Sequence, residues 1–100
     1  MSSSNHKLKV GIIGYGVVGK KRHSILKKYK QLNVIAASDV NDESLLFLPK
    51  NIQKFNDYKK LINESNCNLV FISVPNRFAA EATKLALRKD MHVFCEKPPA

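Results

Sequence analysis

The sequence predicts a single α/β domain built on a doubly wound parallel sheet with the strand order 3-2-1-4-5. Two observations lead to this fold class. Short apolar runs alternate with segments of helical character, and such alternation implies right-handed crossovers between parallel strands. The first apolar run also leads directly into the glycine-rich segment Gly14-Tyr15-Gly16-Val17-Val18-Gly19. In a sheet of this kind, a ligand is expected at the carboxyl ends of the strands.

Each expected strand is a short and mainly apolar run, as a parallel sheet covered on both faces requires. In chain order, these runs are Lys7–Ile13, Val34–Ser38, Ile52–Phe55, Asn68–Val74 and Met91–Cys95.

The first expected helix lies between the first two strands. It spans Val17–Tyr29, with lysines on its outer face and apolar residues near helical spacing on the inner one. Those apolar residues are Val18, Ile25, Leu26 and Tyr29. After the second strand, one helical turn is expected around Glu43–Phe47, and Pro49 ends it.

Two further helices are expected in the second half of the chain. Asp57 is a candidate N-cap for a helix that continues through Asn63, and Asn76 is one for the helix that follows Pro75. Asp90 stands where a helix often ends in a left-handed residue. The inner face of the last helix is expected to consist of Phe78, Ala82, Leu85 and Ala86.

The segment from Lys7 to Asp39 reads as strand, glycine turn, helix, strand and acid, which is the dinucleotide-binding fingerprint in its expected context. Gly14 permits a tight turn, Gly16 lets a pyrophosphate approach the backbone, and Gly19 lets the helix pack on the strand. The N-terminus of that helix suits a diphosphate. Asp39 can accept hydrogen bonds from the adenosine ribose and would repel a 2′-phosphate. We therefore predict a Rossmann-type domain that binds NAD in preference to NADP. The alternative, a glycine-rich turn without a ligand, is disfavoured by the two strands and the spaced acid.

The composition disfavours several other classes of protein. The 100 residues are 44% hydrophobic, which allows one modest core, and they contain no apolar run long enough to span a membrane. Residues 1–6 are expected to be a disordered lead-in rather than a secretory signal, so a cytoplasmic location is the default. The net charge of +9 raises the possibility of nucleic-acid binding. However, no aromatic residues interleave with the lysines, and solvated helix faces are the favoured interpretation.

Cysteine and histidine spacing indicates neither a disulfide nor a metal site. Cys67 and Cys95 fall at opposite ends of neighbouring predicted strands, too far apart for a disulfide, and both are expected to be buried or half-buried thiols. No cluster of cysteine and histidine has zinc spacing. His6, His23 and His92 are interpreted as structural or solvated residues.

Four segments of the chain, in order, are KVGIIGYGVVGKKRH, VIAASDVND, LVFISVPNRFAAEATKLAL and HVFCEKPPA. Through these segments the chain resembles, from Lys7 to Ala100, the Gfo/Idh/MocA oxidoreductases, which include glucose–fructose oxidoreductase and inositol dehydrogenase. The Pro75-Asn76 pair and Glu96-Lys97-Pro98 are more specific than the glycine motif. Members of this family transfer a hydride between a nicotinamide cofactor and a hydroxyl or carbonyl carbon, usually on a sugar or cyclitol.

The resemblance implies roles for individual residues. Lys97 is expected near the reacting carbon as the catalytic residue, where it could help to move the hydroxyl proton. Glu96 is expected to reach the nicotinamide ribose, and the Lys97-Pro98 bond is a candidate cis peptide. The implied cofactor-binding residues are Gly14, Tyr15, Gly16, Val17, Val18, Gly19, Asp39, Pro75, Asn76, Glu96 and Lys97.

The chain also departs from the family pattern. Family members carry a second α/β domain that supplies substrate contacts, whereas residues 7–100 are expected to form only part of the dinucleotide-binding domain. A sugar-like substrate, and any homo-oligomer, would then depend on that absent domain. In addition, Ala79 stands where many members have a histidine, so a contact made by that histidine is missing.

Two other functions remain open at this stage. The first is a non-catalytic dinucleotide-binding or sensing module, against which Lys97 counts. The second is a methyltransferase-type nucleotide fold, since such folds also use glycine-rich turns and an acid at a strand end.

Overall fold

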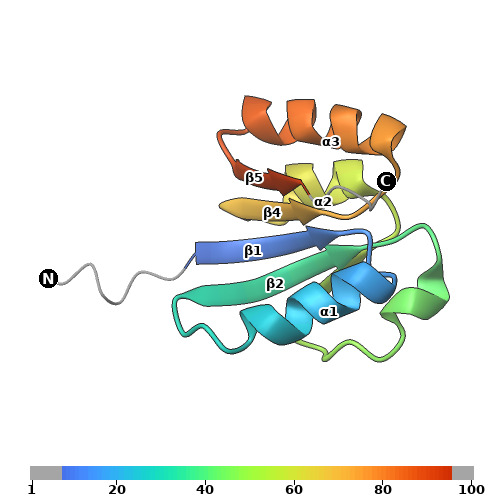
Figure 1. Cartoon of the computed structure of the whole chain (residues 1–100), viewed down its shortest axis with the longest axis vertical. Coiled ribbons are helices and arrows are strands. Elements are labelled where there is room, and N and C mark those ends of the chain that lie inside the picture. Colours follow the sequence, from blue (N-terminus) through green and yellow to red (C-terminus); the bar gives the residue numbers. More distant parts are fainter. Residues whose placement is uncertain (1–7, 96–100) are drawn as a thin grey trace, which may run out of the picture.

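Parallel pairing brings five strands of the chain into one sheet (Figure 1). The structure is a computed structural model, and it describes residues 8–95. The strands lie in the order β3-β2-β1-β4-β5, which confirms both the predicted fold class and the predicted strand order. Their bounds are β1 Leu8–Ile13, β2 Leu32–Ser38, β3 Gln53–Phe55, β4 Leu69–Ile72 and β5 His92–Cys95.

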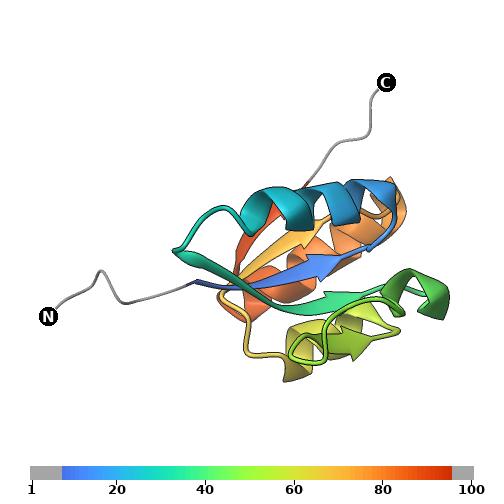
Figure 2. The same cartoon turned by 90° about the horizontal axis from the view of Figure 1, so that it is seen from below.

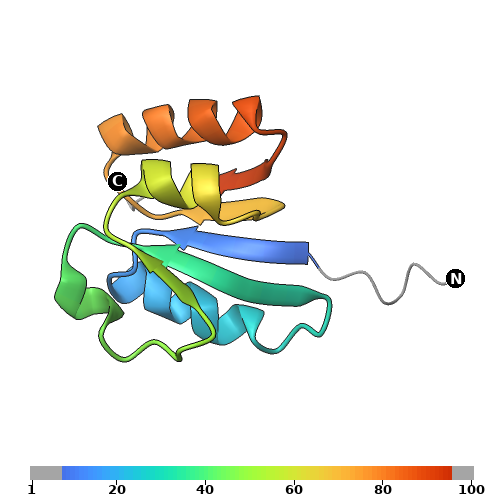
Figure 3. The same ribbon diagram turned by 180° about the vertical axis from the view of Figure 1, so that it is seen from behind.

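The helices cover both faces of this sheet, so the domain has three layers (Figures 1 and 2). The helix α1 (Val17–Leu26) links β1 to β2 and lies on one face. The helices α2 (Tyr58–Glu64) and α3 (Asn76–Arg88) lie side by side on the other face, as Figure 3 shows from behind. A short 3-10 helix, η2 (Asp42–Leu45), occupies the connection between β2 and β3.

Alternation along the strands divides the apolar residues into two clusters, one under each helical layer. Val10 and Ile12 of β1 pack in the cluster that includes Leu26 of α1. Ile13 packs in the cluster formed with α2 and α3, together with Val70 and Ile72 of β4. The short, mainly apolar strands therefore supply both faces of the sheet with a core, as predicted for a parallel sheet covered on both sides.

One strand pair departs from regular register. Val10 pairs with Val34 and Gly11 pairs with Ala36, so Ile35 is an extra residue in β2. Ile35 and Ala36 both contact the core on the α2 and α3 side. After this bulge, the register brings the ends of β1 and β2 level at Ile13 and Ser38.

The predicted inner face of α1 is largely wrong. The buried residues of the helix are Gly19, His23 and Leu26, and Leu26 is the only member of the predicted face that is buried. Val18 and Ile25 are exposed. The rotation of the helix follows from Gly19, which lies so close to the glycine turn that a Cβ there would overlap the carbonyl oxygen of Gly14. That contact overrides the weak apolar pattern of the segment.

Several boundaries also differ from the prediction. The helix α1 ends at Leu26 rather than at Tyr29, which is exposed, and β2 begins at Leu32. The strand β4 spans Leu69–Ile72, so it begins one residue later and ends two residues earlier than predicted.

The helix caps divide into two confirmed predictions and one correction. The carboxylate of Asp57 caps α2 by accepting the N–H of Lys59 at 2.8 Å, and Asp90 has a positive φ of 59° after α3. Asn76, in contrast, is the first residue of α3 and not its cap. The cap position belongs to Pro75, and no side chain caps this helix by a hydrogen bond.

The cysteines are free, as expected. They flank the parallel pair β4 and β5, with Cys67 before the start of β4 and Cys95 at the end of β5. Cys67 is buried, and burial raises the pKa of its thiol. Cys95 is exposed, so the expectation of a buried or half-buried thiol is wrong for this residue. Among the described residues, no helix is long and apolar enough to cross a membrane.

We expect Gly19→Ala to lower the free energy of unfolding by about 1–3 kcal/mol, because the added methyl group must displace backbone that has no room to move. Urea denaturation measures this change. Gly16→Ala is the matched control, since nothing lies within 4 Å of a Cβ at that position. Equal stabilities of the two variants would contradict the close packing of Gly19 on the turn.

Candidate functional site

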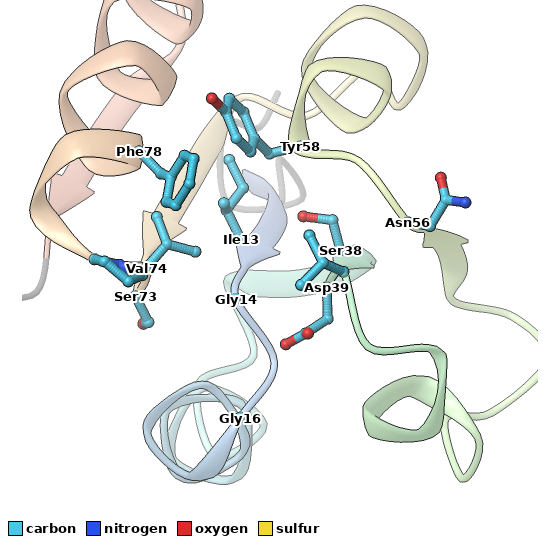
Figure 4. A pocket seen from close by; sticks show the side chains of 12 residues that line it. Ile13, Gly14, Gly16, Ser38, Asp39, Asn56, Tyr58, Ser73, Val74 and Phe78 are labelled. Carbon is cyan, nitrogen blue, oxygen red and sulfur yellow. The ribbon is translucent and has the colours of Figure 1, made fainter.

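The parallel register brings the ends of the central strands to one edge of the sheet. Ile13, the last residue of β1, pairs with Ser38 of β2 and with Ile72 of β4. The chain segments that follow these strands surround a pocket of about 360 Å³ (Figure 4). Its lining residues are Ile13, Gly14, Gly16, Ser38, Asp39, Val40, Asn56, Tyr58, Ser73, Val74, Pro75 and Phe78.

The glycine turn forms one side of this pocket. Gly14 has a φ of +91°, and a Cβ there would lie 2.8 Å from the carbonyl oxygen of Ser73. Both facts require glycine. Gly16 differs, because no atom lies within 4 Å of the position its Cβ would take. A ligand can therefore approach the backbone at Gly16 from the open side of the turn.

The N-terminus of α1 lies at the same turn. Gly16 occupies its N-cap position, no side chain forms a capping hydrogen bond, and the first turn contains no acidic residue. The first N–H groups of a helix have no partner within the helix, and together they carry a partial positive charge. This helix end is therefore free of the carboxylate that commonly satisfies such groups, and it suits an anionic ligand.

Asp39 directly follows β2 and lies against the glycine turn. One oxygen of its carboxylate accepts the N–H of Tyr15 at 2.8 Å, and the other accepts the N–H of Asn41 at 2.9 Å. Figure 4 shows the carboxylate on the side of the pocket where Gly14 and Gly16 lie. Each carboxylate oxygen can accept more than one hydrogen bond, so the half-buried Asp39 retains acceptor capacity toward the pocket.

The side chain of Tyr15 points away from the pocket and into the core beneath α1. Its hydroxyl and Nδ1 of His23 share a hydrogen bond of 2.6 Å, and both side chains are buried. Burial raises the pKa of Tyr15. Burial, together with the positive charge of Lys27, lowers the pKa of His23. His23 therefore has a structural role, as the sequence predicted.

Two aromatic residues that the sequence analysis did not assign to the site form the opposite wall of the pocket. Phe78 comes from α3 and Tyr58 from the start of α2 (Figure 4). The hydroxyl of Tyr58 donates a hydrogen bond to Glu81. Desolvation, this hydrogen bond and the negative charges of Glu81 and Asp57 raise the pKa of Tyr58 to about 12. A signal was present in the sequence, since Tyr58 lies just beyond the third strand, at the edge where the site was expected.

The structure brings together only some of the predicted site residues. Gly14, Gly16, Asp39 and Pro75 line the pocket, and Val17 and Val18 are exposed at the start of α1. Gly19 does not line the pocket but packs against the carbonyl group of Gly14 in the turn. Asn76 follows Pro75 as the first residue of α3. Glu96, Lys97 and the Lys97-Pro98 bond lie outside the described residues. Within residues 8–95, no group of three or more metal-ligating side chains could hold a metal ion.

These features fit a nucleotide diphosphate. An open glycine, an uncapped helix N-terminus and a strand-end carboxylate lie beside a mainly apolar pocket at the carboxyl edge of a parallel sheet. The glycine and the helix N-terminus suit a pyrophosphate, the carboxylate suits a ribose, and the apolar pocket suits an aromatic base. The fold and the site thus define a dinucleotide-binding domain of the Rossmann type.

Comparison with known proteins identifies the family. Residues 8–100 match the family of oxidoreductases with an NAD-binding Rossmann fold called Gfo/Idh/MocA, and the chain belongs to this family as its NAD-binding part. The resemblance inferred from the sequence motifs is therefore confirmed.

Individual relatives agree with this assignment. The chain is 33% identical over 98 residues to inositol 2-dehydrogenase of Salmonella typhimurium strain LT2, which covers 93% of this chain and 29% of that protein. It is 34% identical over 97 residues to D-glucoside 3-dehydrogenase of Escherichia coli strain K12, covering 93% of this chain and 28% of the relative. The chain thus spans less than a third of the length of these relatives.

A solved structure shares the fold closely. The scyllo-inositol dehydrogenase from Lactobacillus casei, with bound NAD(H) and scyllo-inositol, superimposes with a TM-score of 0.85 at 29% identity. The match covers 92% of this chain and 28% of that one.

We expect the stability of the fold to fall on acidification because of His23. Its folded-state pKa is lower than the ordinary value of 6.5, so the unfolded chain takes up a proton first. This source of stability is fully present above pH 6.5 and is lost as the pH falls from there to the folded-state pKa. Urea midpoints measured at about pH 7.5 and about pH 5.5 test this expectation.

His23→Gln should lose less stability than the wild type over this interval, because glutamine does not titrate. The matched control is His92→Gln, which replaces an exposed histidine of β5 and should retain the wild-type pH dependence. If His23→Gln and the wild type lose the same stability, the buried histidine is not the source.

Proposed function

We propose that this chain is the cofactor-binding part of an oxidoreductase that transfers a hydride to or from a hydroxyl or carbonyl carbon of a sugar- or cyclitol-like substrate. The observation that carries the proposal is the glycine turn, open at Gly16, with the carboxylate of Asp39 beside it. The names of the similar dehydrogenases support the substrate class, since they include inositol and glucoside dehydrogenases.

NAD is the proposed cofactor in preference to NADP. The carboxylate of Asp39 retains acceptor capacity toward the pocket, and ribose hydroxyls are donors that can use it. A 2′-phosphate at the same place would bring two negative charges together in a half-buried site, where repulsion is screened less than in water. Among the similar structures, the scyllo-inositol dehydrogenase contains NAD(H).

The proposed pyrophosphate contacts come from backbone N–H groups between Gly16 and Val18. The N–H of Tyr15 is already donated to Asp39, which leaves the following groups to the ligand. In our proposal, Gly19 supports these groups indirectly by letting α1 approach the turn. Pro75, and Asn76 after it, are proposed to border the cofactor in the pocket, on the side where β4 ends.

Glu96 and Lys97 are proposed to complete the site. They follow Cys95 in the chain, and Cys95 pairs with Ile72 at the sheet edge that carries the pocket. When bound, the nicotinamide ring supplies the acceptor or donor of the hydride. Lys97 is proposed to take up or return the proton of the reacting hydroxyl group, and Glu96 to bind the nicotinamide ribose.

The remaining parts of the proposal concern the longer protein and its location. Residues 7–100 are proposed to be one part of a two-domain protein, because the similar dehydrogenases are more than three times longer than the matched segment. The second domain would provide substrate contacts and any homo-oligomer interface. A cytoplasmic location is proposed as well, and the two free cysteines are compatible with it.

We expect calorimetric titration to show tighter binding of NAD than of NADP. Asp39→Ala should weaken NAD binding roughly tenfold or more, because a hydrogen bond to a charged group is lost. The same substitution should also reduce the preference for NAD over NADP. Asp42→Ala is the control, because Asp42 is an exposed acid that does not line the pocket. The proposed cofactor is wrong if the folded wild type binds neither dinucleotide or prefers NADP.

We expect Lys97→Met, made in a protein that includes the substrate domain, to lower kcat by about 10²–10⁴, the usual contribution of general acid–base catalysis. Steady-state kinetics with a cyclitol substrate measure this loss. Lys89→Met serves as control, since Lys89 is exposed at the end of α3. An unchanged kcat in Lys97→Met would remove the proton-transfer role.

A further inference from the structure

The glycine turn is held mainly from the end of β2. The N–H of Gly14 donates to the carbonyl oxygen of Ser38 at 2.9 Å, and the N–H of Tyr15 donates to the carboxylate of Asp39 at 2.8 Å. Gly16, the next residue, has no atoms close to the position of a Cβ. The hydrogen bond from Tyr15 to Asp39 is therefore the contact that holds the turn directly before the open position at Gly16.

Both the main chain and the side chain of Tyr15 form hydrogen bonds. Its main chain is bonded to Asp39, whereas its side chain is buried under α1 and shares a hydrogen bond of 2.6 Å with His23. The rings of Tyr15 and His23 also meet edge to face, with centroids 5.7 Å apart. Tyr15 thus connects Asp39, at the end of β2, with His23 of α1. The N-terminus of α1 lies in the chain between Tyr15 and His23.

We infer that Asp39 is a positioning residue for the glycine turn, acting through the N–H of Tyr15, in addition to its proposed contact with the adenosine ribose. The inference rests on the proposed function, because the ligand is the proposed dinucleotide. The carboxylate would contact the ribose of that ligand directly and would act on its pyrophosphate through the glycine turn. Asp39 binds the turn with one oxygen and the N–H of Asn41 with the other, while further acceptor capacity faces the pocket.

This role has a consequence that a ribose contact alone does not have. Without the carboxylate, the N–H groups of Tyr15 and Asn41 both lose their acceptor. The turn then becomes less ordered before a ligand arrives, and a ligand must order it on binding. Loss of Asp39 therefore weakens the binding of a nucleotide diphosphate even when that nucleotide has no ribose hydroxyl groups.

The first test measures amide hydrogen exchange of the ligand-free chain by NMR. In Asp39→Ala, the amide of Tyr15 should exchange roughly tenfold faster or more than in the wild type, because it has lost a charged acceptor. The amide of Ile12, in the buried strand beside it, reports whether the core is intact. Asp42→Ala removes an equal charge nearby and should leave Tyr15 protected. Unchanged exchange at Tyr15 in Asp39→Ala overturns the inference.

The second test separates positioning from the ribose contact. ADP and 2′,3′-dideoxy-ADP are titrated into the wild type and Asp39→Ala, and binding is followed by NMR shifts. Positioning requires that Asp39→Ala weaken the binding of both nucleotides. If Asp39→Ala binds dideoxy-ADP as tightly as the wild type does, or more tightly, the carboxylate acts on the ribose alone and the inference is overturned.

A second variant covers the case in which Asp39→Ala does not fold. Asp39→Asn keeps the size of the side chain but has one acceptor oxygen in place of two, so the amide of either Tyr15 or Asn41 should exchange faster than in the wild type. Wild-type exchange at both amides contradicts the inference. Failure of the proposed function is distinguishable: a wild type that binds neither NAD nor ADP refutes that function, while the exchange data on Tyr15 still decide the positioning role.

Discussion

The close contact between Gly14 and Gly19 determines most of what is distinctive in this domain. The carbonyl oxygen of Gly14 lies where a side chain on residue 19 would have to be, so backbone packs directly against backbone. This contact fixes both the distance and the rotation of α1 relative to β1. Once the rotation is set, His23 and Leu26 must face the sheet, because they lie one and two turns further along the same side. The helix N-terminus is then placed at the carboxyl edge of the sheet.

This geometry explains why a polar pair lies in an otherwise apolar layer. Burial of a histidine and a tyrosine is unfavourable unless their polar atoms are paired, and the bond between the Tyr15 hydroxyl and Nδ1 of His23 provides that pairing. An apolar pair could fill the same space. The hydrogen bond, however, has a preferred length and direction. It therefore also restrains Tyr15, whose main chain directly precedes the open position at Gly16.

The sequence was sufficient for the topology and for the position of the glycine turn and of Asp39, but not for the aromatic wall of the pocket. Gly14, Gly16, Gly19 and Asp39 could be placed because each is tied to a local backbone requirement or to a fixed place after a strand. The inner face of α1 was misjudged because a tertiary contact at Gly19, rather than the apolar pattern, sets its rotation. Phe78 and Tyr58 were missed because their common position at the pocket depends on how α2 and α3 pack across the sheet. Such packing leaves no periodic signal in the sequence, and the one local signal was the place of Tyr58 just after the third strand.

The hydrogen bonds of Asp39 also bear on how cofactor preference can change in a domain of this kind. A smaller or neutral residue at this position would remove repulsion toward a 2′-phosphate. It would also leave two backbone N–H groups, those of Tyr15 and Asn41, without their carboxylate acceptor. The N–H of Tyr15 is part-buried, and such a donor without a partner is costly, whereas the exposed N–H of Asn41 can bond to water. A change of preference from NAD to NADP therefore requires more than the loss of an acid, because another acceptor must hold the start of the glycine turn. If Asp39 both selects the ligand and positions the turn that binds it, as we propose, specificity and affinity cannot vary independently at this residue.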